Sequence, residues 1–248
     1  MKVIRQVYAN KGVEADYRKR LKNLVNKMNK IVLMWILANA GTKTANQITK
    51  ELIKFVKKYR KIFGSEGDKI VRKFVKDMEK HATIGMKNAF AEAGLNVRPN
   101  ISDRVKSAVY FENKGLVSSI PEKYFDGIQT ILMMAILYGW TKGDLTKAIK
   151  KRYIITERRV RVITSDQTHK TNEIFKRSIC EELGVKKARW VYTWRSEKPR
   201  ENHVEMDGAV YDMDKGCYDY YSDDYIQPAQ LYNCKCSFRP IIEEIGDK

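Results

Sequence analysis

Apolar side chains recur every three to four positions through the first hundred residues, and lysine and asparagine occupy many of the positions between them. The first stripe comprises Val13, Tyr17, Leu21, Leu24, Val25, Met28, Ile31, Val32, Trp35 and Ile36. Two further stripes comprise Ile48, Leu52, Phe55, Val56 and Tyr59, and then Ile70, Val71, Phe74, Val75, Met78, Met86 and Phe90. This spacing is typical of helices with one buried face. The pattern therefore predicts an antiparallel helical array, interrupted at Gly41 and by a turn at residues 64–67.

The helical spacing resumes after a predicted break at residues 98–100, where Arg-Pro-Asn disfavours a helix. Pro121 suits the first turn of a helix, because an amide proton is not needed there. The predicted helices span residues 102–111, 121–138, 145–152 and 156–183, with a loop at 115–119 and a stop at Gly184.

The pattern changes after Gly184, where residues 188–194 are aromatic and β-branched, as in a strand. Residues 210–211 and 237–241 are candidates to pair with it. The predicted fold class is α+β: an N-terminal helical array followed by a long helix packed on a small C-terminal β-sheet. The predicted division is a basic helical region at 1–98, a connector at 99–120, a domain at 121–241 and a tail at 242–248.

The charge of the chain is strongly positive and unevenly distributed. The formal net charge is +18, with 23 basic and 8 acidic residues in 1–100 but 4 basic and 11 acidic residues in 201–248. A basic surface of this kind favours a polyanionic partner, and we expect non-specific contact with double-stranded DNA. The predicted DNA-contacting residues are Lys19, Arg20, Lys54, Lys57, Lys58, Arg60, Lys61, Arg72 and Lys73.

The apolar runs at 31–38 and 131–138 are far shorter than the roughly 20 residues that span a bilayer, so we expect no membrane association. No apolar run follows the first charged residues, so we expect no signal peptide. The chain has four cysteines, too few for a disulfide scaffold at this length. We therefore expect a soluble protein made in a reducing compartment.

Polar residues interrupt the apolar face of the helix predicted at 156–183. Counting along that face from Ile163 leads to Gln167 and then to Lys170 or Thr171, where an unpaired buried polar group would cost a few kcal/mol. Partners must therefore come from later in the chain. We expect a buried cluster, architectural in role, that includes Gln167, Lys170, Asn172, Trp194, Arg200, His203 and Asp207.

Five short patterns follow one another between residues 166 and 236. They are Asp166-Gln167-Thr168-His169-Lys170-Thr171-Asn172, Trp194-Arg195, Arg200-Glu201-Asn202-His203, Asp207-Gly208 and Cys234-Lys235-Cys236. In this order they resemble the signature of the phage Mu F-type minor head proteins, the head-morphogenesis family of tailed phages. The resemblance covers roughly residues 121 to 241.

The resemblance implies a minor capsid protein that docks on the portal protein or the major capsid protein in the head interior. It implies a place in the virion, at the head interior or the portal vertex, after assembly in the host cytoplasm. The expected role is support of head assembly or genome delivery, with no catalytic residue and no cofactor.

Two alternatives from other classes remain open. A metal-dependent nuclease would use His203, Asp166, Asp207 and Lys170, which are residue types found in such sites. A zinc-stabilised nucleic-acid-binding module would take its four ligands from His203, Cys217, Cys234 and Cys236.

Overall fold

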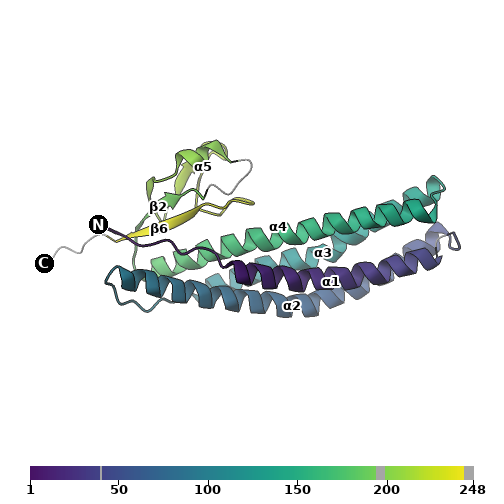
Figure 1. Ribbon diagram of the computed structural model, residues 1–248, viewed down its shortest axis with the longest axis horizontal. Coiled ribbons are helices and arrows are strands. Elements are labelled where there is room, and N and C mark those ends of the chain that lie inside the picture. The colour runs from purple at the N-terminus through teal and green to yellow at the C-terminus, as the bar shows by residue number, and fades with distance from the viewer. Residues whose placement is uncertain (40, 194–198, 243–248) are drawn as a thin grey trace. The chain divides into compact units, whose positions relative to one another are not determined.

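The computed structural model describes residues 1–39, 41–193 and 199–242. The long helices come first and most of the strands last, which confirms the predicted α+β class (Figure 1). The elements in chain order are β1 (Lys2–Val3), α1 (Lys11–Asn39), α2 (Ala45–Glu92), α3 (Asp103–Leu137), α4 (Lys142–Glu182), β2 (Lys187–Val191), α5 (Glu201–Glu205), β3 (Val210–Asp212), β4 (Cys217–Asp219), β5 (Asp224–Ile226) and β6 (Ser237–Ile242).

The chain divides into two compact units, each made of discontinuous segments. Unit 1 comprises Met1–Glu14, Val75–Val109 and Ser165–Lys248, and unit 2 comprises Ala15–Phe74 and Tyr110–Thr164. Separate domains at 1–98 and 121–241 stay a prediction. Among the described residues, no helix combines the length and the apolar character that a membrane crossing requires.

Unit 2 is a helical bundle built from parts of α1, α2, α3 and α4 (Figure 1). Most of the apolar stripe of α1 is buried, although Ile31 is exposed, and Tyr17 stacks on Phe74 with ring centroids 4.3 Å apart. The buried hydroxyl of Tyr124 donates a hydrogen bond to Asn29 Oδ1 at 2.8 Å. Helical periodicity thus correctly predicted which face of α1 is buried.

Three predicted interruptions of the helices are wrong. Residues 64–67 lie inside α2, residues 115–119 lie inside α3, and α4 runs without a break through 153–155. Gly67 serves helix packing, because a Cβ built there would lie only 2.8 Å from Val117 Cγ1. Pro121 lies within α3, where buried neighbours on the same helix outweigh its poor helix propensity.

Helix α4 begins at Lys142, slightly before the predicted start at residue 145, and capping contacts mark this start. Thr141 Oγ1 accepts a hydrogen bond from the Asp144 amide at 3.2 Å, and Asp144 Oδ2 accepts one from the Thr141 amide at 3.2 Å. This reciprocal pair satisfies two amide groups that the helix itself leaves without partners.

Unit 1 holds an antiparallel sheet with strand order β1-β6-β2-β3 and a separate β4-β5 hairpin. In the central pair, Trp190 of β2 lies opposite Phe238 of β6, and both are buried. The predicted strands near 188, 210 and 237 are therefore confirmed. Sequence reasoning missed β1, whose two residues pair with the end of β6.

Candidate functional site

The C-terminal part of α4, within unit 1, buries an unusual number of polar side chains. These are Asp166, Gln167, Thr168, His169, Thr171, Asn172, Glu173, Lys176 and Ser178. The prediction that Gln167 and Thr171 point inward is confirmed, whereas Lys170 is half-buried. Side chains on several faces of this part of α4 are therefore buried, and not those of one face alone.

A buried ion pair joins this part of α4 to β6. Lys176 Nζ lies 2.8 Å from Glu173 Oε2 and donates hydrogen bonds to Ser237 Oγ at 2.9 Å and to the Phe238 carbonyl at 3.1 Å. The Lys176 side chain is 0% exposed, so its three ammonium protons depend entirely on these partners. The pair therefore has the full set of hydrogen bonds that a buried charge requires.

The N-terminal segment completes this network. Asn172 Nδ2 donates to the Val7 carbonyl at 3.1 Å and to Glu173 Oε1 at 2.9 Å, and the Gln6 amide donates to Ser237 Oγ. Sequence reasoning missed Glu173 and Lys176. Their spacing of three along a helix was a usable signal, because such pairs can face each other.

The same part of α4 positions the segment that carries Cys234 and Cys236. The amide of Asn233 donates to Asp166 Oδ1 at 2.6 Å, and Lys235 Nζ donates to Ser165 Oγ at 3.2 Å. Thr193 Oγ1 donates to the Lys235 carbonyl at 2.8 Å. Burial lowers the pKa of Lys235, and the nearby Asp166 carboxylate opposes that shift. The Cys234-Lys235-Cys236 segment is therefore fixed from several sides.

His203 lies beside the thiols of Cys234 and Cys236. Cys234 Sγ and Cys236 Sγ each lie 3.5 Å from His203 Nδ1, and all three side chains are buried. The hydrogen bond from the Cys236 thiol, together with His203, lowers the pKa of Cys234. Trp190 packs edge-on against the His203 ring, with centroids 5.6 Å apart. The arrangement is a compact set of groups that can bind a metal.

Cys217, the fourth predicted zinc ligand, is not part of the group formed by His203, Cys234 and Cys236. Cys217 lies in β4, opposite Ile226 of β5, and is only half-buried. In the part of the chain that the structure describes, the group within ligand distance contains His203, Cys234 and Cys236, without Cys217. Burial raises the pKa of Cys217 to about 11, so its thiol is protonated at neutral pH.

Two of the remaining signature residues, Arg200 and Asp207, are exposed and lie outside any buried cluster, which corrects that part of the expectation. Arg200 is exposed and donates to the Tyr232 carbonyl at 3.0 Å, and exposed Asp207 accepts from the Tyr192 amide at 2.9 Å. Gly208 has a φ of +82°, which favours glycine at this turn. Trp194 and Arg195 lie outside the described residues. Arg200 and Asp207 thus satisfy backbone groups on either side of α5.

The residues proposed for a nuclease have separate partners. Asp166 holds the Asn233 amide, Asp207 holds the Tyr192 amide, and His203 faces the two thiols. Each of these groups therefore has a role in holding the fold.

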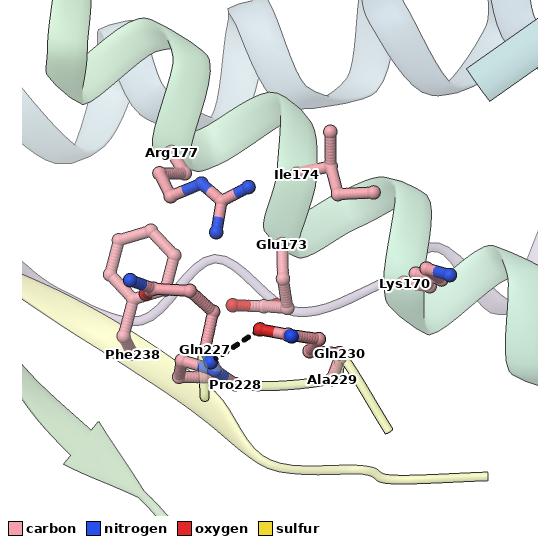
Figure 2. Close-up of a pocket in the computed structure, with 9 residues that line it drawn as sticks. All are labelled: Lys170, Glu173, Ile174, Arg177, Gln227, Pro228, Ala229, Gln230 and Phe238. Carbon is pink, nitrogen blue, oxygen red and sulfur yellow. Dashed lines mark hydrogen bonds between the residues drawn. The ribbon is translucent and has the colours of Figure 1, made fainter. Parts of the chain in front are cut away.

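A small pocket of about 120 Å³ lies between α4 and the Gln227–Gln230 segment (Figure 2). Its lining comprises Lys170, Glu173, Ile174, Arg177, Gln227, Pro228, Ala229, Gln230 and Phe238. Figure 2 shows the Gln227 amide hydrogen-bonded to Gln230 Oε1, at 2.8 Å, which closes a turn beside Glu173. Pockets for small-molecule ligands usually measure roughly 300–1,000 Å³. This pocket is too small to indicate such a ligand.

All the predicted DNA-contacting residues belong to unit 2 and are exposed. Several are paired with acidic groups, as Arg72 is with Asp68 at 2.7 Å and Lys54 with Glu51 at 2.7 Å. Within the described residues, the ion pairs do not include Lys57 or Lys61 of α2. The first part of α2 therefore presents lysines of the predicted basic surface that lie outside these ion pairs.

Fold and site together define a class: an α+β protein in which a long helix carries a polar signature that anchors a small C-terminal sheet. A comparison with known families places this signature within a matched region. Residues 126–239 match the family described as Phage Mu protein F like protein. The match confirms the predicted resemblance.

A relative from Haemophilus influenzae (strain ATCC 51907 / DSM 11121 / KW20 / Rd), described as an uncharacterized protein, is 31% identical over 252 residues. That alignment covers 96% of this chain and 55% of the relative. The chain thus spans about half the length of the curated relative it matches. No solved structure matches the chain significantly.

Proposed function

We propose that this chain is a minor head protein of a tailed phage that docks on portal or capsid subunits in the head interior. It contacts packaged DNA without sequence preference and supports head assembly or genome delivery. The observation that carries the proposal is the Phage Mu protein F like match over residues 126–239, which includes the whole of α4 and the whole signature.

The charge pattern supports the DNA contact. Residues 45–63 of α2 contain six basic residues and a single acidic one, and their lysines are exposed. Lysine ammonium groups on a helix surface can neutralise phosphates without reading bases. Binding of this kind suits a protein that meets whatever sequence is packaged.

The contacts of unit 1 support a structural role over an enzymatic one. The conspicuous polar groups of α4 are used to hold β6, the N-terminal segment and the Cys234–Cys236 segment. We expect purified protein to leave duplex DNA intact in the presence of magnesium or manganese. Metal-dependent cleavage that disappears in His203→Ala would contradict the structural role.

The DNA contact is tested by measuring affinity for duplex DNA as a function of salt. Replacing Lys54, Lys57, Lys58 and Lys61 with glutamine should reduce the slope of log affinity against log salt. If all four lysines contact phosphates, the reduction should be about 3 to 4, because each contact contributes roughly 0.9.

A matched control removes the same charge from another exposed region of unit 2. Replacing Lys142, Lys147, Lys150 and Lys151 of α4 with glutamine should change the slope much less. Equal losses in the two variants would contradict the assignment to α2. Absence of DNA binding by the unaltered protein would contradict the DNA contact itself.

A further inference from the structure

Three potential metal-binding atoms converge in unit 1 from two parts of the chain about 30 residues apart. His203 comes from α5, whereas Cys234 and Cys236 precede β6. Their ligand atoms all lie within 4.8 Å of one another. Each of the three residues is at most 3% exposed, so this is a built interior site and not a chance surface grouping.

The separations fit a tetrahedral zinc ion. With Zn–S distances of about 2.3 Å and Zn–N distances of about 2.0–2.1 Å, tetrahedral angles place sulfur and nitrogen ligands about 3.5 Å apart. Both sulfur atoms lie 3.5 Å from His203 Nδ1. A zinc ion therefore requires no change in these two separations.

The charges of the three ligand groups also fit a zinc ion. Two thiolates and a neutral imidazole carry two negative charges, which balance a divalent zinc ion. A buried site of this composition avoids the large free-energy cost of an uncompensated interior charge. Sulfur and imidazole ligands favour zinc over the hard cations magnesium and calcium.

The far side of the imidazole supplies independent support. His203 Nε2 lies 3.7 Å from Asp219 Oδ2, and both atoms are buried without a hydrogen-bond partner among the described residues. Asp219 is itself held, because its Oδ1 accepts from the Asn202 side chain and from the Tyr221 amide at 2.9 Å. Metal on Nδ1 would place the imidazole proton on Nε2, facing this carboxylate. Such a carboxylate partner commonly orients a metal-bound histidine.

We propose that His203 Nδ1, Cys234 Sγ and Cys236 Sγ bind a structural zinc ion that joins α5 to the segment before β6. Asp219 orients His203, while Asp166 and Thr193 hold the cysteine-bearing segment in place. The fourth position of the ion takes water or another ligand. This proposal is independent of the proposed role in the phage head.

Metal analysis of the tag-free full chain tests the proposal directly. We expect about one zinc per chain, and we expect cobalt-substituted protein to show thiolate-to-cobalt charge-transfer absorption. Cys234→Ser and Cys236→Ser should lose the metal and that absorption. Cys217→Ser should retain both, because Cys217 lies outside the ligand group.

Asp219→Asn provides a second variant that leaves the three ligands in place. Its affinity for zinc should fall by about 10- to 100-fold, while zinc at saturating concentration still fills the site. The asparagine keeps Oδ1 as an acceptor but turns an amide group toward the protonated Nε2. Unchanged zinc affinity in this variant would overturn the role of Asp219.

Measurements on the unaltered protein keep the test decisive if a cysteine variant does not fold. Chelation should lower the melting temperature, and added zinc should restore it. The proposal is overturned if the unaltered protein binds neither zinc nor cobalt. A disulfide between Cys234 and Cys236 in the freshly purified protein, or equal metal loss in Cys217→Ser, would also overturn it.

Discussion

Helix α4 contains two regions that obey different physical rules. Residues 142–164, in unit 2, bury aliphatic side chains such as Leu145 and Ile149 and expose lysine and arginine. Residues 165–182, in unit 1, bury Glu173 and Lys176 together with a series of amides and hydroxyls. The same helix thus has an ordinary amphipathic part and a part whose interior is largely polar.

The difference shows how each region is specified. Burial of an aliphatic side chain stabilises the folded state by about 1.5–3 kcal/mol. Such a side chain can often be replaced by another apolar one of similar volume. A buried ion pair contributes little net stability, yet loss of one partner leaves a charge without compensation. Residues 165–182 therefore accept β6 and the N-terminal segment only in an arrangement that supplies partners to the buried Glu173–Lys176 pair.

The largest expected effect comes from removing one member of the buried ion pair. Lys176→Met leaves Glu173 charged in the interior. The hydrogen-bond donors that then remain for this carboxylate are Ser237 and Asn172. We expect the free energy of unfolding to fall by about 3–5 kcal/mol, as measured by urea denaturation.

The control for this change is Lys150→Met in the other part of the same helix. Lys150 is exposed, so the substitution should alter stability by less than about 0.5 kcal/mol. Similar effects from the two substitutions would remove the distinction between the two parts of α4.

An intermediate effect is expected from packing in unit 2. In Gly67→Ala the new methyl group would lie 2.8 Å from Val117 Cγ1, a stiff β-branched side chain. We expect the overpacking to exceed the gain in helix propensity, with a net loss of about 1 kcal/mol measured by urea denaturation.

Gly64 provides the matched position, because a Cβ there meets no atom within 4 Å. Gly64→Ala should therefore stabilise the protein by about 0.5–1 kcal/mol. Stabilisation by both substitutions would show that the approach of α2 to α3 does not require glycine.

The smallest effect concerns a carboxylate near the surface of unit 2. Hydrogen bonds from the Tyr110 hydroxyl and then from Arg72 lower the pKa of Asp68 to about 2. Because the folded pKa is depressed, this contribution is present above pH 4 and is lost as the pH falls toward 2. Solvent screening limits it to about 1 kcal/mol or less.

Melting temperatures between pH 5 and pH 2 test this contribution. Asp68→Asn should be less stable than the parent at pH 5 and nearly equal to it at pH 2. Tyr110→Phe, which removes the principal hydrogen bond and keeps the carboxylate, should give an intermediate result. A constant difference across the range would contradict the depressed pKa.

Much of the fold could be predicted from the sequence, because apolar spacing identifies a helix face wherever only one face is buried. The stripes of α1 and α2 follow from that rule. The strand around Trp190 follows instead from its aromatic and β-branched residues, and the segment around Phe238 was a candidate to pair with it. The predicted break at 64–67 was wrong because Gly67 serves close helix packing and not a turn. The predicted break at 115–119 was also wrong, and a Cβ at Gly115 would meet no atom within 4 Å, so the helix continues there without a packing role for the glycine.

The candidate site was only partly predictable. Inward-facing Gln167 and the grouping of His203 with Cys234 and Cys236 followed from spacing and residue type. The Glu173–Lys176 pair was missed because its partners, Ser237 and the N-terminal segment, lie far away in the sequence. Local periodicity contains no information about which distant strand covers a helix.

The measurement that tests the proposed function most directly is the protein content of purified phage particles from a strain that carries this gene. Quantitative mass spectrometry of intact particles and of DNA-free heads should find this chain at a few copies per particle, together with portal and major capsid proteins. Imaging of labelled particles should place it at the portal vertex or in the head interior. Absence of the chain from particles that contain portal, capsid and DNA would contradict its assignment as a minor head protein.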